Sequence, residues 1–298
     1  MFSIKKIWKH TCFDFQKWKR NPRIIVTFSL AFLLCLMLSN RAIEFATMYG
    51  THTQIFEVFI WTFGDPNSIM LSSLLLMLLL GDIPFVTNVT TYQIIRSSRT
   101  NWILGQMLYV FISSLIYIFS LLAITCILSA HNSYIGNKWS DTSALLGYSG
   151  VGQKIALPTS VKVLEMSKPF RCMIMIFILV FLYILFISEI MYLANLCRNK
   201  YWGVVSVLLV NMYGLFLSPE IFKKIFHLSD AVEYKANVAV GWLSPLNQAT
   251  YYMHNFGLDY LPSISSSIAF FTANIVILYF LICARAKRYE FSFIQTIE

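Results

Sequence analysis

Six long apolar stretches separated by polar connections constrain this chain more than any other feature of its sequence. A helix needs about 20 apolar residues to cross a bilayer core of roughly 30 Å, and all but the slightly short first stretch have about that length. Because a water-soluble fold cannot hide so much apolar surface, the pattern predicts an all-α polytopic membrane protein with six transmembrane helices. The predicted spans are residues 24–39, 69–89, 102–129, 171–196, 201–217 and 263–284.

The basic residues predict the orientation of these spans. An even number of spans places both termini on one side. Lysine and arginine gather before the first span, between the second and third, between the fourth and fifth, and after the sixth. Basic flanks mark the cytoplasmic side, so we expect both termini in the cytoplasm of a multi-pass plasma-membrane protein. The net charge of +9 then needs no nucleic-acid partner to explain it.

Residues 1–22 have the pattern of an amphipathic helix. Trp8, Phe15 and Trp18 share one side of a helix with Ile4, while the lysines fall largely on other sides. Such a helix lies at the membrane interface, with tryptophan at headgroup depth and lysine near anionic lipid. The sequence therefore predicts an interfacial anchor. The alternative is a basic flank that only sets topology.

The connection between the second and third spans, residues 88–101, carries the most informative motif. A short helical run is followed by a Ser-Arg pair, a tryptophan and Leu-Gly-Gln at the start of the next span. This order resembles the cytoplasmic loop of type 2 ATP-binding cassette (ABC) exporter permeases. Gln106 stands where that family usually has lysine, and the glutamate often found early in the loop is missing. The alternative is a plain connection whose arginines obey the positive-inside rule.

The resemblance implies a coupling helix that seats in a cleft of a separate ATPase subunit. The residues expected to make that contact are Tyr92, Gln93, Ile94, Ile95, Arg96 and Arg99. A compact helix between two rigid spans can transmit motion to both. The order of parts along the whole chain also matches the family.

The segment between the fifth and sixth spans contains an apolar run that is too short to cross a bilayer. Residues 238–243 precede Ser244 and Pro245, which resemble the usual break in the family's short re-entrant helices. A run of this length is expected to be re-entrant or interfacial. A folded outer loop with a few buried apolar residues is the alternative.

Two carboxylates fall inside predicted spans, where charged groups usually face a protein interior or a cavity. Glu189 lies in the fourth span and Asp82 near the end of the second. Both are candidates for lining a substrate path, coupling to a proton or pairing with a basic residue. For Asp82 the sequence favours a boundary salt bridge or a helix break. For Glu189 a functional role and a purely structural role both stay open.

The chain is predicted to form a single transmembrane domain, 1–298. Its parts are the interfacial helix 1–22, spans one to three within 24–129, an outer loop 130–170, spans four to six within 171–284, and a cytoplasmic tail 285–298. The outer loop is unusually long and is expected to fold as a small cap, to contact substrate or to remain a solvated linker.

The sequence offers no catalytic site and no metal site. The six cysteines and five histidines show no metal-ligand spacing, and no phosphate-binding loop or catalytic triad is present. The chain is therefore not expected to be an enzyme or to bind a cofactor itself. The resemblance places ATP and Mg on the partner ATPase.

The leading hypothesis is the permease subunit of an ABC exporter, paired with a second copy or a homologous permease and with two ATPase subunits. Its expected cargo is lipophilic or amphipathic, such as a membrane-active antimicrobial peptide, an antibiotic or a lipid-linked molecule. One alternative is an immunity or sensor protein of the same fold that intercepts a peptide at the membrane. Another is an ATP-independent secondary transporter or an intramembrane enzyme.

Overall fold

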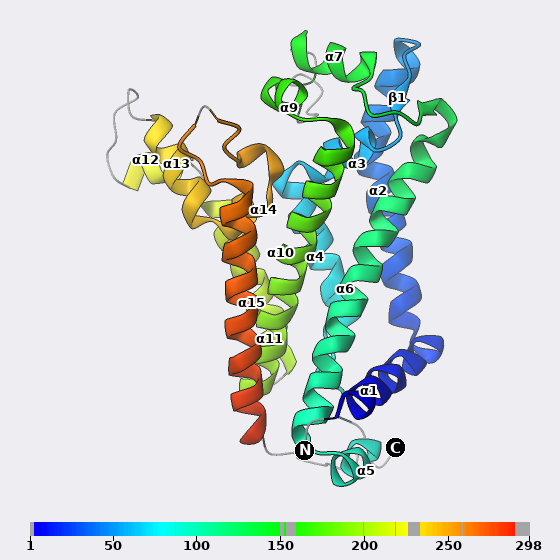
Figure 1. Cartoon of the computed structure of the whole chain (residues 1–298), viewed down its shortest axis with the longest axis vertical. Helices are drawn as coiled ribbons and strands as arrows, with labels where there is room; N and C mark the ends of the chain where they lie inside the picture. Colours follow the sequence, from blue (N-terminus) through cyan, green and yellow to red (C-terminus); the bar gives the residue numbers. More distant parts are fainter. Residues whose placement is uncertain are drawn as a thin grey trace.

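The computed structural model describes residues 3–86, 88–149, 152, 159–198, 200–217, 219–225, 233–257 and 259–289. Long helices run side by side, with a small cap at one end and two short helices at the other (Figure 1). We call these the cap end, which carries α3, α7 and α9, and the α1 end, which carries α1 and α5. The α-helices are α1 Ile4–Gln16, α2 Pro22–Met48, α3 Glu57–Phe63, α4 Pro66–Leu80, α5 Asn88–Arg96, α6 Arg99–Ser129, α7 Asp141–Tyr148, α9 Val161–Met166, α10 Pro169–Cys197, α11 Lys200–Phe216, α12 Pro219–Ile225, α13 Glu233–Leu243, α14 Pro245–Ala249 and α15 Ile264–Lys287.

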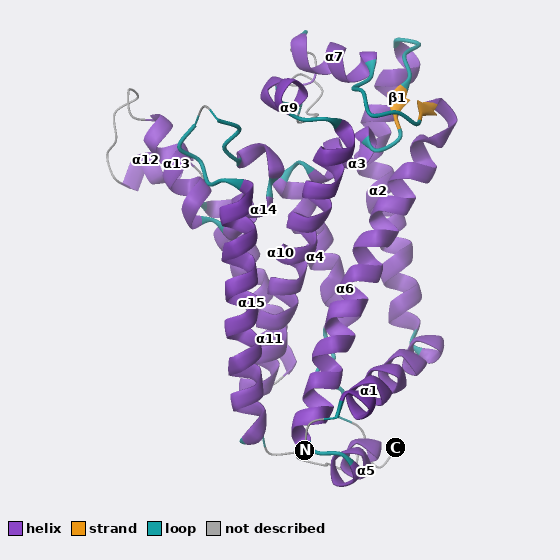
Figure 2. Ribbon diagram, viewed as in Figure 1, coloured by secondary structure: helices purple, strands orange, loops and turns teal. Residues whose placement is uncertain are grey.

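Four helices of the described chain, α2, α6, α10 and α15, are long and apolar enough to cross a membrane. The count rises to five if α3 and α4, which meet at an angle of 84°, are taken together as one bent span. Helix α11 is apolar but shorter. The chain is thus an all-α protein with the helices of a multi-pass membrane protein, and Figure 2 shows how little of it lies outside helices.

Proline and short polar side chains determine where several helices begin. Pro22, Pro66, Pro169 and Pro245 each occupy the first turn of a helix. There the fixed φ of proline suits the helix and its missing N–H costs nothing. Asn21 and Asp65, the residues before two of these prolines, accept hydrogen bonds from the free N–H groups of the first turn.

The second predicted span is wrong at its C-terminal end. The sequence predicts a span over 69–89, whereas α4 ends at Leu80. Gly81 and Pro84 follow, and proline cannot donate the backbone hydrogen bond that would continue a helix. The structure also adds α3, which the sequence analysis did not predict. Every residue of α3 is buried.

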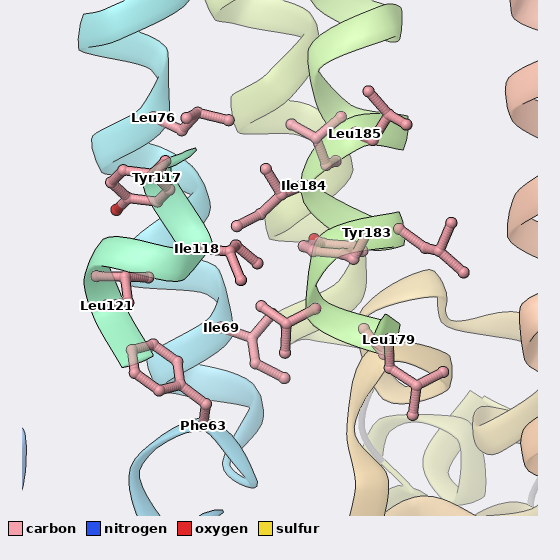
Figure 3. Close-up of a cluster of buried hydrophobic side chains, with 14 of the residues drawn as sticks. Phe63, Ile69, Leu76, Tyr117, Ile118, Leu121, Leu179, Tyr183, Ile184 and Leu185 are labelled. Carbon is pink, nitrogen blue, oxygen red and sulfur yellow. The ribbon is translucent and has the colours of Figure 1, made fainter. Parts of the chain in front are cut away.

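Helix α10 forms the centre of the molecule and packs against α3, α4, α6, α11, α14 and α15. Leu179, Ile184 and Leu185 of α10 face Ile69 of α4 and Ile118 of α6 in a continuous apolar cluster (Figure 3). Apolar contact alone gives weak preference between partners in lipid, so close packing and polar contacts between helices set the arrangement.

Polar side chains inside the bundle bond the helices to one another. Tyr117 of α6 donates its hydroxyl to the carbonyl of Ser72 in α4 at 2.9 Å. Ser73 of α4 and Tyr183 of α10 both donate to the side-chain oxygen of Asn211 in α11, at 2.9 and 3.0 Å. These hydrogen bonds satisfy polar groups that are buried away from water. The two bonds to Asn211 also attach the short helix α11 to α4 and α10.

The cap is folded around a buried carboxylate. Glu57, the first residue of α3, accepts hydrogen bonds from the backbone N–H of Gln54 at 2.9 Å and of Ser140 at 2.8 Å, and from the Ser140 hydroxyl. The two-residue strands β1, Thr53–Gln54, and β2, Ser133–Tyr134, pair in parallel beside it. The described part of the predicted outer loop 130–170 therefore folds as a cap that includes α7 and α9.

Candidate functional site

The connection between α4 and α6 presents a short helix with apolar side chains exposed. On α5, the side chains of Tyr92 and Ile95 are 67% and 76% exposed, whereas Ile94 packs against the buried core. Ser98 then caps α6 by accepting from the N–H of Asn101. The predicted motif thus forms a compact helix between two longer ones, with two large apolar side chains directed outward.

Contacts with both neighbouring segments hold the predicted coupling residues in place. Lys6 of α1 donates to the carbonyl oxygen of Arg96 at 3.1 Å. The Arg99 guanidinium donates to the carbonyl oxygen of Lys287, the last residue of α15, at 3.2 Å. Gln93 is half-buried and Arg96 is exposed. The last residue of α5 is therefore bonded to α1, and the first residue of α6 is bonded to the end of α15.

Helix α1 lies against the first turns of α6. Thr11 donates its hydroxyl to the carbonyl of Gly105 at 2.9 Å, and Asn101 accepts from the N–H of Ser3 at 3.2 Å. The two backbones approach so closely at Gly105 that an added Cβ would lie 2.6 Å from the Cβ of His10. The glycine of the Leu-Gly-Gln motif is therefore needed for the docking of α1.

The structure separates the three predicted anchor residues. Trp8 is 55% exposed beside the exposed Ile4. Phe15 and Trp18 pack inward, and the Trp18 indole N–H donates to the hydroxyl of Tyr109 at 2.8 Å. An anchoring role in lipid stays a prediction for all three. Trp8 is exposed as that role requires, whereas Trp18 and Phe15 hold the end of α1 to α6.

Burial shifts the pKa values of two ionisable side chains on the side of α1 that docks against α6. It raises the pKa of Asp14 even though Lys17, 2.7 Å away, acts in the opposite direction. Burial also lowers the pKa of His10, and the positive charge of Lys6 adds to that effect. The Lys17 ammonium lies 4.7 Å from the centre of the Phe85 ring, a cation–π contact between the turn that follows α1 and the α4–α5 connection.

An open cleft of about 920 Å³ lies at the α1 end, where α2, α4 and α11 come together. Arg23 and Asp82 form an ion pair at its edge. The sequence favours a boundary salt bridge or a helix break for Asp82, and its place at a membrane boundary stays a prediction. The Arg198 guanidinium also lines the cleft and stacks over the ring of Trp202, 4.4 Å from its centre. Apolar side chains of α2, α4 and α11 line much of the remaining wall, and the polar side chain of Asn195 of α10 also lines the cleft.

Glu189 lies on α10, fully buried, and neither of its carboxyl oxygens has a hydrogen-bond partner within the described residues. One turn closer to the α1 end, Tyr192 donates to the side-chain oxygen of Gln106 at 3.2 Å. One turn further, Asn195 donates to the carbonyl of Ile83 at 2.6 Å and accepts from the N–H of Gly203 at 2.9 Å. Glu189, Tyr192 and Asn195 thus follow one another at three-residue spacing along α10, and of these three Asn195 lines the cleft.

Ser244 and Pro245 lie at the junction of α13 and α14. Ser244 caps α14 by accepting from the N–H of Asn247 at 3.3 Å, and Pro245 is the first residue of that helix. The Ser244 hydroxyl also donates to the carbonyl of Gly214 in α11 at 3.4 Å. The predicted break is therefore a real change of helix, bonded to the end of α11.

Sequence reasoning missed Asn195, Asn211 and Tyr183, which bond helices to one another inside the bundle. Asparagine is rare in apolar spans, so Asn195 and Asn211 could have been singled out as polar residues in need of partners.

Comparison of the chain with protein-family models, with curated proteins and with solved structures finds no match.

Proposed function

We propose that this chain is the permease subunit of an ABC exporter and that α5 is the helix through which its ATPase subunit acts. The observation that carries the proposal is the exposure of Tyr92 and Ile95 on a short helix whose Ile94 packs against the core. Large apolar side chains exposed near one another at the end of a bundle are suited to contact a protein partner. A hydrolysing partner would supply the energy, since the sequence offers no phosphate-binding loop.

In this proposal the chain spans the plasma membrane six times, with α2, α4, α6, α10, α11 and α15 as the spans and both termini in the cytoplasm. Helix α11 is short for a span, but its bonds to α4 and α10 seat it within the bundle. Helices α13 and α14 form the re-entrant segment between the last two spans. Two permeases and two ATPases make up the complex.

Motion of the ATPase would be transmitted through several helices together. A push on α5 reaches α6 through the Ser98 cap, α1 through Lys6, and α15 through the bond from Arg99 to Lys287. Because packed helices move as rigid bodies between discrete arrangements, a small displacement of α5 would tilt α6 and α15 and change the space between them. The cargo is a lipophilic or amphipathic molecule.

The test is co-purification of the full-length chain with an ATP-binding cassette subunit from the membranes of its own source, followed by ATPase assays of the complex. We expect Ile95→Asp to reduce the amount of captured ATPase about tenfold or more, because a central apolar contact is replaced by a charge. Ile135→Asp, a matched change at a residue 81% exposed at the cap end, should leave capture unchanged. A chain that carries no ATPase, or equal capture by both variants, would contradict the proposal.

A further inference from the structure

The cleft at the α1 end combines an apolar wall with a basic edge. Val26 of α2 and Leu78 of α4 line it while remaining 49% and 45% exposed, and Val204 of α11 lies on the same wall. These residues belong to the first turns of α2 and α11 and the last turn of α4. The apolar wall therefore lies where the hydrocarbon core of a membrane would end and its headgroups would begin.

The charges at the edge of the cleft leave an excess of positive charge. Arg23 is paired with Asp82, so these two charges largely cancel. Arg198 is exposed and, within the part of the chain that the structure describes, stacks on Trp202 and makes no ion pair. Stacking fixes the plane of a guanidinium and leaves its N–H groups free to bind the oxygens of an anion.

The volume of about 920 Å³ is within the range of pockets that bind small ligands. An apolar wall next to a single uncompensated arginine fits an amphiphile with one acidic end. We propose that the cleft binds one membrane lipid with an acidic headgroup, its acyl chain along Val204 and Leu78 and its headgroup at Arg198. The site requires only that the α1 end lies at a membrane surface, so it does not depend on the proposed transport function.

Native mass spectrometry of the purified full-length chain tests this site. The probes are phosphatidylglycerol, phosphatidylcholine and free glycerol phosphate. We expect one phosphatidylglycerol to bind about fivefold more tightly than phosphatidylcholine, as one basic side chain near a headgroup contributes. Glycerol phosphate should bind far more weakly than either lipid, because it has no chain to bury.

Two pairs of variants locate the binding. Val204→Trp places a bulky ring over the apolar wall and should weaken binding of both lipids about tenfold, whereas Val205→Trp, at the next residue, which does not line the cleft, should leave binding unchanged. Arg198→Gln should remove the preference for the acidic lipid, and Arg288→Gln, outside the cleft lining, should keep it. Arg198→Lys restores the charge and should recover part of the preference.

Several results would overturn the site. The first is equal affinity for the acidic and the zwitterionic lipid in the unmodified chain. The second is lipid binding by Val204→Trp that equals that of Val205→Trp, with both variants shown by thermal unfolding to be folded. Glycerol phosphate binding as tightly as phosphatidylglycerol would identify a free phosphate site instead. None of these outcomes affects ATPase capture, so the two proposals can fail separately.

Discussion

Two short helices, α3 and α5, connect longer helices at opposite ends of the bundle, and they are built in opposite ways. All seven residues of α3 are buried, and its only charged residue, Glu57, is held by hydrogen bonds to the cap. Helix α5 instead exposes Tyr92 and Ile95. A connecting helix whose side chains are all buried, as in α3, serves to stabilise the fold. One that leaves large apolar side chains outside is suited to meet another molecule.

The largest expected effect is at the buried connection. Glu57→Ala should destabilise the chain by about 3 kcal/mol, because the N–H groups of Gln54 and Ser140 would lose their acceptor inside the protein. Unfolding in detergent can be followed by a thiol-reactive dye, since Cys35 and Cys172 are free and buried. Glu57→Gln keeps one acceptor oxygen and should cost less. Equal stability of Glu57→Ala and the unmodified chain would remove the contrast between α3 and α5.

The docking of α1 gives the next effect. Gly105→Leu should cost about 2 kcal/mol, because the new side chain would collide with His10 and the carbonyl of Ile7. The loss of stability should be confined to the docking of α1. Protease cleavage after the lysines of α1 should accelerate while the thermal midpoint of the remaining bundle changes little. Gly136→Leu, in the cap, serves as the matched control. If α1 remains as protected as before, then α1 is not held by this contact.

Some of the elements behind these predictions could be predicted from the sequence, and others could not. The length of the apolar stretches was enough to predict the long helices, and the Ser-Arg and Leu-Gly-Gln motif was enough to locate α5. The buried helix α3 could not be predicted because Glu57 at its start reads as a solvent residue until Ser140, far along the chain, supplies its donors. The cleft likewise depends on distant ends of α2, α4 and α11 meeting in space.

The pH dependence of α1 docking should be smaller. The pKa of His10 lies below its ordinary value of 6.5, chiefly because of burial. Its contribution to stability is therefore fully present above pH 6.5 and is lost as the pH falls through the lowered folded pKa. Protection of α1 from protease should decline as the pH falls from 6.5 through the lowered folded pKa in the unmodified chain. His10→Gln should weaken this decline, while Asp14, which titrates in both proteins, cancels in the comparison. An identical decline in both proteins would show that another group is responsible.

The smallest effect on stability is expected at α5 itself. Ile95→Ala should change the free energy of unfolding by less than about 0.5 kcal/mol, because the side chain is 76% exposed. Ile94→Ala, on the neighbouring residue that packs against the core, should cost clearly more. Thermal unfolding of the two variants side by side provides the measurement. A large loss for Ile95→Ala would mean that this side chain supports the fold rather than a partner.

Site-directed photo-crosslinking tests the central claim most directly. A benzophenone amino acid replaces Tyr92 on α5 in one version of the full-length chain and Tyr148 in the cap, where the side chain is 62% exposed, in another. The account predicts a crosslink from position 92 to an ATP-binding cassette subunit in native membranes, and none from position 148. Absence of that crosslink at position 92, or an equal one from position 148, would contradict the account.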